Sequence, residues 1–348
     1  MGALILCYHH INYGERIDPE IFEENLITLK EHNFSPVKLI DISEHIVNGK
    51  ELPKRSVHIT FDDGYADNFI YAYPLLKRYG FFATEFIIAN RIVSGKKRAN
   101  YDELKSMNLT HTIEQMLKDS QYLSWEEIRE MSQSGIFEIG SHSLNHNACF
   151  SSDKIRKFNN GNAGEWFYAY TQDKRLGIPV YEKRWECAAD CLRDDLKLRD
   201  YLSDYVKRQG GVFFFRHSNY KRILFKKYRE YVKKYRLDMY FEERYKRILK
   251  IKHEIADSKR FIEDKIKENV NFFCYPWGDY DELSKSEVQK AGYLGALTLD
   301  VGLNNRRTDP YLMKRVEVRG KKNWLKNKLK IYGNEMLSSI YSKIYHKI

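Results

Sequence analysis

The sequence predicts an α/β fold in which a parallel sheet or barrel is covered by helices on its outside. Short apolar runs alternate with segments of helical spacing over the first half of the chain and again near its end. Acidic and histidine residues directly follow several of the predicted strands. Parallel α/β folds collect their chemistry at that end of the strands. At 348 residues the chain can form one large domain or two smaller ones.

Strands and helices alternate regularly in the first half of the chain. Asp18 followed by a proline marks one helix start, and Ser124 opens a capping box that starts another. A further helix is expected over 68–79, and 90–120 is expected to be a polar excursion with a short helix. The predicted strands are 4–8, 37–40, 56–60, 82–88 and 137–140.

The pattern changes at residues 151–245, which we interpret as a helical, basic insertion. Residues 185–208 have helical spacing, whereas 210–215 resemble a strand. Between Arg216 and Arg236 nine Lys or Arg stand against one acidic residue. Such a run is either a solvated helix face or a surface for an anionic partner.

The α/β pattern then resumes, after a helix over 245–268. Residues 1–150 and 246–320 are therefore assigned to one barrel, and 321–348 to a basic amphipathic tail. The tail either docks on the fold or lies on a membrane surface, and docking is the favoured reading. The last predicted strands are 271–275, 295–299 and 313–318, with a helix over 282–289 between the first two.

Composition narrows the classes of partner. The net charge of +11 favours acidic glycans or anionic lipid headgroups, and no nucleic-acid-binding module is recognisable. No apolar run reaches the roughly 18 residues of a membrane span, and no secretory signal is recognised. The five cysteines lack the spacing of a disulfide framework. We therefore expect a cytoplasmic protein that can contact a membrane face peripherally.

Two adjacent carboxylates, Asp62 and Asp63, stand at the end of a predicted strand. Like charges so close raise each other's pKa unless a cation or separate hydrogen bonds intervene. Taken alone, Asp-Asp-Gly is most simply a solvated turn. If a metal ion binds one carboxylate, however, the other is free to act as a base.

His142 and His146 present two imidazoles at a spacing that allows both to bind one Zn²⁺ or similar ion. Asp63 would complete a set of two histidines and one carboxylate, which leaves a position for water and lowers its pKa towards about 7. Asp62 would then be the base that deprotonates this water. The simpler alternative is a pair of loop histidines bonded to the backbone.

These motifs, in this order, resemble the polysaccharide deacetylases (carbohydrate esterase family 4, the NodB-homology domain). The resemblance covers roughly 1–150 and 246–320. It implies a distorted (β/α) barrel and metal-dependent removal of N-acetyl groups from glycans. The stretches that carry it are Leu6-Cys7-Tyr8-His9, Thr60-Phe61-Asp62-Asp63-Gly64-Tyr65, Ser141-His142-Ser143-Leu144-Asn145-His146 and Tyr275-Pro276-Trp277-Gly278.

By position, the resemblance implies that Asp62 is the base and that one divalent ion, expected to be Zn²⁺, binds Asp63 and the two histidines. Tyr65 and the Pro276-Trp277-Gly278 turn are expected to contact the substrate. The backbone N–H of Trp277 is expected to help hold the oxyanion.

The chain also departs from the family pattern. Many members carry the acid histidine on a late Leu-x-His strand, which is missing here. Leu6-Cys7-Tyr8-His9 is similar to members whose acid-bearing strand has moved to the N-terminus, so His9 is the candidate acid and His10 should face the other way. Tyr275 stands where many members have an arginine, and Arg315 is expected to pair with Asp62 instead.

The resulting hypothesis is a metal-dependent hydrolase that removes N-acetyl groups from an N-acetylhexosamine-containing polysaccharide or glycan precursor. The basic insertion would recruit a substrate that is anionic. Two alternatives remain open: a carbohydrate-binding or scaffold protein that has lost its metal, and an amidohydrolase that acts on a non-sugar amide.

Overall fold

The computed structural model describes residues 2–162 and 173–345, which fall into two compact units. The first unit contains Met1–Asn145, Lys252–Asp279 and Lys285–Ile348. The second contains His146–Ile251 and Tyr280–Ser284. The predicted insertion therefore lies within the second unit, which begins at His146 itself.

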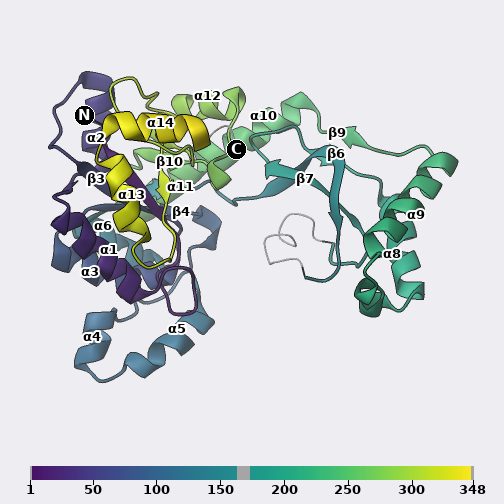
Figure 1. Cartoon of the computed structure of the whole chain (residues 1–348), viewed down its shortest axis with the longest axis horizontal. Helices are drawn as coiled ribbons and strands as arrows, with labels where there is room; N and C mark the ends of the chain where they lie inside the picture. The colour runs from purple at the N-terminus through teal and green to yellow at the C-terminus, as the bar shows by residue number, and fades with distance from the viewer. Residues whose placement is uncertain (1, 163–172, 346–348) are drawn as a thin grey trace. The chain divides into compact units, whose positions relative to one another are not determined.

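A curled sheet of parallel strands forms the centre of the first unit (Figure 1), in the order β11-β10-β5-β4-β3-β1-β12. A parallel bridge between Leu297 and Met313 links β11 to the segment that leads into β12, so the ring nearly closes. This arrangement is the distorted barrel that the sequence predicts. The strands are β1 Leu4–Tyr8, β2 Ser35–Pro36 (beside the start of β3), β3 Ser56–Asp63, β4 Ala83–Ile87, β5 Phe137–Ser141, β10 Phe272–Cys274, β11 Gly295–Leu297 and β12 Val316–Glu317.

Helices connect these strands, and several begin where the sequence predicts. The Asp18 carboxylate accepts a hydrogen bond from the Ile21 N–H, and the Ser124 capping box is formed. Both caps satisfy N–H groups that have no partner inside the helix. The helices are α1 Pro19–Glu31, α2 Leu39–Asn48, α3 Tyr73–Tyr79, α4 Tyr101–Ser106, α5 Ile113–Asp119, α6 Trp125–Gln133, α11 Ser258–Ile266, α12 Glu282–Lys290, α13 Trp324–Tyr332 and α14 Glu335–Tyr345. A further helix, α10 (Arg244–Lys252), belongs to the second unit up to Ile251.

The predicted strand over 37–40 is wrong, because the chain enters α2 at Leu39. The Asp41 side chain accepts the backbone N–H of Lys38 at 3.1 Å, which is half of a capping box. Leu39, Ile42 and Ile46 then share one buried helical face. The apolar residues that suggested a strand are therefore part of the buried face of a helix.

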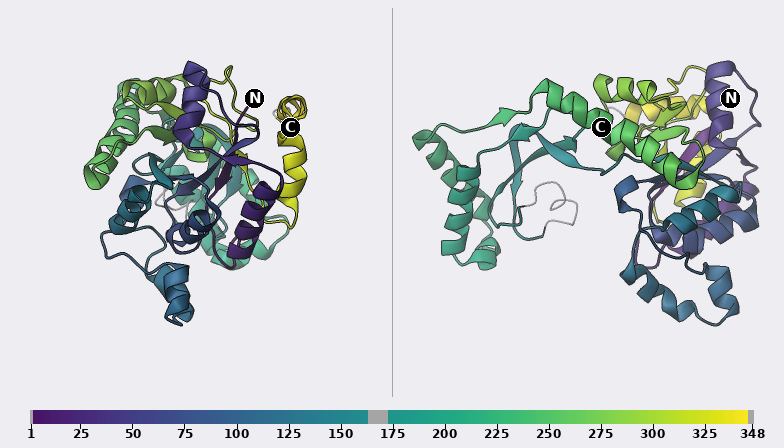
Figure 2. Two further views of the ribbon diagram at one scale, coloured as in Figure 1. Left: turned by 90° about the vertical axis from the view of Figure 1, so that its left-hand side faces the viewer. Right: turned by 180° about the vertical axis from the view of Figure 1, so that it is seen from behind.

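The tail docks on the first unit. α13 buries Leu325, Leu329 and Tyr332 and runs beside α1 (Figures 1 and 2). In α14, the Ser342 hydroxyl donates to the Val301 carbonyl at 2.6 Å. Within the described residues, no helix is both long and apolar enough to span a bilayer.

The second unit is more β-rich than predicted. β6 (Ala148–Phe158) and β7 (Pro179–Trp185) form an antiparallel pair, and β8 (Leu192–Arg193) pairs with β9 (Tyr240–Phe241). The predicted helix over 185–208 begins only at Leu196, as α8 (Leu196–Arg208). The predicted strand over 210–215 is a short 3₁₀ helix, because Gly210 and Gly211 both adopt positive φ.

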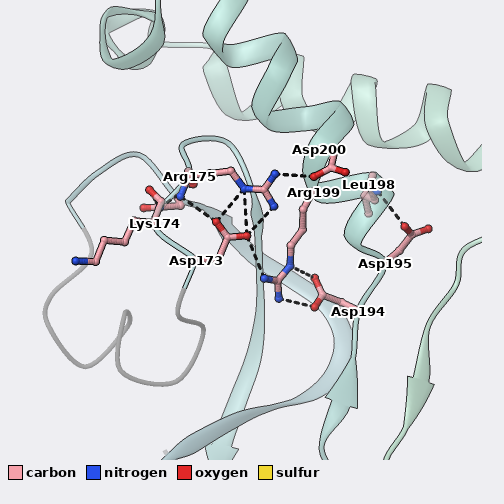
Figure 3. Close-up of polar contacts among 9 residues, drawn as sticks. Asp173, Lys174, Arg175, Asp194, Asp195, Leu198, Arg199 and Asp200 are labelled. Carbon is pink, nitrogen blue, oxygen red and sulfur yellow. Dashed lines mark hydrogen bonds and ion pairs between the residues drawn. The ribbon is translucent and has the colours of Figure 1, made fainter.

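A charged network fixes the start of α8 in this unit (Figure 3). Arg199 binds the Asp194 carboxylate through two nitrogens and also contacts Asp173, while Arg175 joins Asp173 to Asp200. α8 packs against α9 (Tyr220–Lys234) through a shared apolar cluster. The basic run of the sequence lies mainly on α9, with most of its lysines and arginines exposed.

Candidate active site

Most of the predicted site residues lie at one edge of the sheet. Asp62 and Asp63 end β3, His9 follows β1, and His142 follows β5. The Pro276-Trp277-Gly278 turn comes after β10. Because these strands are parallel, their carboxyl ends meet at the same end of the barrel.

Asp63, His142 and His146 form a buried cluster whose ligand atoms all lie within 4.8 Å of one another. The Nδ1 of His142 lies 2.8 Å from the Cys274 carbonyl, an acceptor, so Nδ1 carries the proton. Nε2 is then a lone-pair atom, and it faces the Asp63 Oδ1 at 3.6 Å. Two acceptors directed at each other suit a cation between them.

The protonation state of His142 also supports a metal ion at this position. Burial lowers the pKa of His142, which keeps the ring neutral, and a neutral imidazole is the form that binds a metal. Two histidines and one carboxylate are a donor set typical of a catalytic zinc site. The residues present therefore fit a divalent ion.

The loop that carries the two histidines is held from one side by Glu254. Its carboxylate accepts the backbone N–H and the side-chain N–H of Asn145, at 3.0 and 2.6 Å. Its carbonyl accepts the Leu144 N–H. Glu254 is buried in a π-helical turn between α10 and α11, and such turns are common at functional sites.

Asp62 is paired with Arg315, the residue expected to stand in for the arginine that many family members carry at the position of Tyr275. Arg315 is fully buried and reaches the carboxylate with two nitrogens, at 2.7 and 2.9 Å. Burial by itself would raise the pKa of Asp62, but the Arg315 guanidinium beside it lowers the pKa well below its ordinary value. The carboxylate is therefore ionised and its orientation is fixed by a bidentate contact.

Two cysteines that sequence reasoning did not assign to the site also contact Asp62. The thiols of Cys7 and Cys274 lie 3.7 and 3.6 Å from its Oδ2. Burial raises the pKa of both thiols, so both are S–H donors. For Cys7 the sequence held a signal: it stands two residues before His9, which directly follows β1, and the alternation of an extended chain places the two side chains on one face.

His9 and His10 face different partners. His9 belongs with Cys7 and Asp62 to a group whose polar atoms lie within 4.8 Å. The Nδ1 of His10 lies 2.6 Å from the Asp67 carboxylate, and its ring stacks on Tyr65 with centroids 3.5 Å apart. The structure thus places His9, and not His10, beside the candidate base.

The remaining predicted residues line the same end of the barrel. The Tyr65 hydroxyl is in hydrogen-bonding reach of Asp63. Trp277 is 40% exposed and adopts a φ of 56°. Gly278 must be a glycine, because a Cβ there would lie 2.5 Å from the Leu299 nitrogen. Pro276, the first residue of the turn, is buried.

Comparison with known proteins agrees with this geometry. Residues 49–174 match the family model of the polysaccharide deacetylases. A Bacillus subtilis (strain 168) protein named as a polysaccharide deacetylase, YxkH, is 33% identical over 144 residues, which are 41% of this chain and 42% of that protein. The poly-β-1,6-N-acetyl-D-glucosamine N-deacetylase of Escherichia coli (strain K12) is 20% identical over 283 residues, 81% of this chain and 30% of that protein.

The chain therefore matches less than half the length of either relative. Among solved structures, a de-N-acetylase from Aggregatibacter actinomycetemcomitans aligns with a TM-score of 0.60 at 15% identity. That alignment covers 94% of this chain and 99% of the other, so the fold is shared almost throughout. The family model, the relatives and the shared fold all show that this chain is similar to the polysaccharide deacetylases, with residues 49–174 matching their family model.

Proposed function

We propose that the protein is a metal-dependent hydrolase that removes N-acetyl groups from an N-acetylglucosamine polymer. The observation that carries the proposal is the pairing of Asp62 with Arg315 beside the buried set of Asp63, His142 and His146. A complete ligand set with an ionised base next to it argues against the alternative of a scaffold that has lost its metal. The names of the relatives support a glycan amide over a non-sugar amide.

Each residue has a stated role in this proposal. Asp63, His142 and His146 would hold the ion, with Zn²⁺ as the proposed metal, and the ion would supply a Lewis acid and an acidified water. Asp62 would accept a proton from the attacking water, because its carboxylate is ionised and held by Arg315. His9, beside Asp62, donates a proton to the leaving amine. The Trp277 turn supplies a backbone donor for the oxyanion.

The polymer is proposed to be β-1,6-linked, on the strength of the activity named for the Escherichia coli relative. We also propose a finer feature of the substrate, an anionic group or anionic surroundings such as a membrane face. Its support is the charge of α9 and its flanks, where nine basic residues between Arg216 and Arg236 stand against Glu230.

The test is acetate release from β-1,6-linked N-acetylglucosamine oligomers by protein loaded with Zn²⁺ and by protein treated with a chelator. We expect Asp62→Asn to keep one equivalent of metal but to lose about 10²-fold or more in rate, because the water loses its base while the ligands remain. His142→Ala should lose the metal itself. Asp264→Asn, which alters an exposed aspartate on α11, is the matched control and should behave as wild type. Full activity after complete metal removal would contradict the proposal.

A further inference from the structure

Two cysteines that are distant in the sequence meet in the second unit. Cys149 lies on β6, which pairs with β7 (Figure 1), and Cys191 directly precedes β8, which packs against β6. Both cysteines are free thiols. The Cys191 thiol donates a hydrogen bond to Cys149, and this contact is the main reason why the pKa of Cys191 is raised. Two thiols in contact are the starting point for a disulfide.

A lysine stands next to this pair. The Nζ of Lys250 lies 2.9 Å from the Cys191 sulfur and 2.6 Å from the Glu242 carboxylate. Burial by itself would lower the pKa of Lys250, but its contacts with Cys191 and Glu242 raise it above the ordinary value. The side chain is therefore an ammonium ion, and an adjacent cation stabilises a thiolate. Cys191 has such a cation beside it when its proton leaves.

A cavity of about 600 Å³ gives small molecules access to the pair. Cys149, Cys191 and Lys250 all line it, and every lining residue belongs to the second unit. Cys149 is partly exposed, whereas Cys191 is 4% exposed, so a reagent from solvent meets Cys149 first. Reactive cysteines are found in partly exposed, electropositive surroundings of this kind. The other cysteine of this unit, Cys187, is buried and lies outside this lining.

We propose that Cys149 and Cys191 form a modification site, which hydrogen peroxide converts into a disulfide. First, the Cys149 sulfur attacks a peroxide oxygen. The O–O bond breaks and an S–O bond forms, which leaves a sulfenic acid on Cys149 and one water.

The Cys191 sulfur, whose charge Lys250 stabilises, then attacks the Cys149 sulfur. The S–S bond forms and the S–O bond breaks, and the departing hydroxide takes up the Cys191 proton as a second water. In sum, two thiols and one hydrogen peroxide give one disulfide and two waters, with two electrons passing from sulfur to peroxide.

The disulfide joins β6 to the segment before β8 and restricts the unfolded chain between them. The oxidised protein should therefore be the more stable form. A dithiol reductant reverses the change by thiol–disulfide exchange.

The experiment treats the reduced full-length chain with a small molar excess of hydrogen peroxide. The free thiols, counted after denaturation, should fall from five to three. Peptide mapping should show one linked pair, through Cys149 and Cys191, that dithiothreitol separates. The Tm of the oxidised protein should exceed that of the reduced protein by about 5 °C or more.

Three variants separate this pair from the other thiols. Cys191→Ser should stop at the sulfenic acid on Cys149, which dimedone traps, and Cys149→Ser should form no disulfide. Neither variant should gain stability on oxidation. Cys187→Ser removes a buried thiol of the same unit and is the matched control: its thiols should fall from four to two, and its Tm should rise as in wild type.

A wild-type protein that keeps all five thiols, accumulates the sulfenic acid on Cys149 or links other cysteines would overturn the proposal. So would a disulfide that still forms in Cys149→Ser. Thiol counting, peptide mapping and thermal unfolding need neither a substrate nor a bound metal. Their outcome is therefore independent of whether the proposed deacetylase activity is found.

Discussion

Four residues of the candidate site have backbones in the left-handed region. Asp63, Ser143, His146 and Trp277 have φ values between 56° and 79°. This conformation is uncommon for residues other than glycine and costs on the order of 1 kcal/mol or more at each position. The site therefore depends on the barrel beneath it, which holds these loops in place with contacts such as that of Asn145 to Glu254.

The contact of Arg315 with Asp62 should be essential to stability as well as to activity. Arg315→Met would leave an ionised carboxylate buried without its cation, and we expect the free energy of unfolding to fall by about 3–5 kcal/mol. Denaturant titration measures this change. Arg16→Met, which breaks an exposed ion pair with Glu317, should cost less than about 1 kcal/mol. Similar small losses in both variants would show that the buried pair adds little.

At the scale of the elements, the sequence predicts those strands and helices well whose own residues form a clear apolar pattern or a helix cap. β3 and β5 are apolar runs that end in polar residues, and α1 and α6 have explicit caps at Asp18 and Ser124. β6 was missed because its stretch after Phe150 is mostly polar and charged and because it pairs with a strand more than twenty residues away. Such long-range pairing leaves no periodic pattern in the sequence.

The same distinction applies to the site. The spacing of His142 and His146 and the adjacency of Asp62 and Asp63 are local, so the sequence predicts both pairs. The contact of Glu254 with Asn145 is not local, because more than a hundred residues separate the two in the sequence, and the sequence does not predict it. Arg315 was anticipated only because the family resemblance required a cation for the base.

The strand β5 carries a half-buried acid, Glu138, that should make stability depend on pH. Burial raises the pKa of Glu138 to about 7, although the Asn271 amide and Lys38 partly offset this effect. The unfolded chain releases this proton near pH 4.5 and the folded protein near 7. The contribution of Glu138 to stability is therefore complete below about pH 4.5 and is lost as the pH rises through 7.

Glu138→Gln should remove this loss. We expect the variant to match wild type near pH 4.5 and to be more stable at pH 8 by about 3 kcal/mol, the equivalent of the pKa shift. Urea unfolding at the two pH values measures the difference. Glu24→Gln changes an exposed carboxylate on α1 and should alter neither value. A variant that is less stable than wild type at pH 8 would show that Glu138 is ionised and paired in the folded protein.

At the scale of the whole molecule, the charge is distributed unevenly. The net charge is +11, and a concentrated part of it lies on α9 and its flanks. Lys226, Arg229 and Lys233 are exposed there, whereas Lys227 is paired with Glu230 at 2.7 Å. The first three are therefore free to act on a distant anion, and Lys227 is held by a local contact.

If the substrate or its surroundings are anionic, this field should speed association, and the effect should weaken steeply with salt. The triple variant Lys226→Glu, Arg229→Glu and Lys233→Glu should lower kcat/KM for an anionic acceptor at low ionic strength and leave a neutral acceptor unchanged. The matched variant Lys54→Glu, Lys77→Glu and Lys96→Glu reverses the same number of exposed charges in the first unit. It should have a smaller effect, because its charges are dispersed along the chain. A salt response that is the same for both acceptors and for both triple variants would leave the basic run with solubility as its only role.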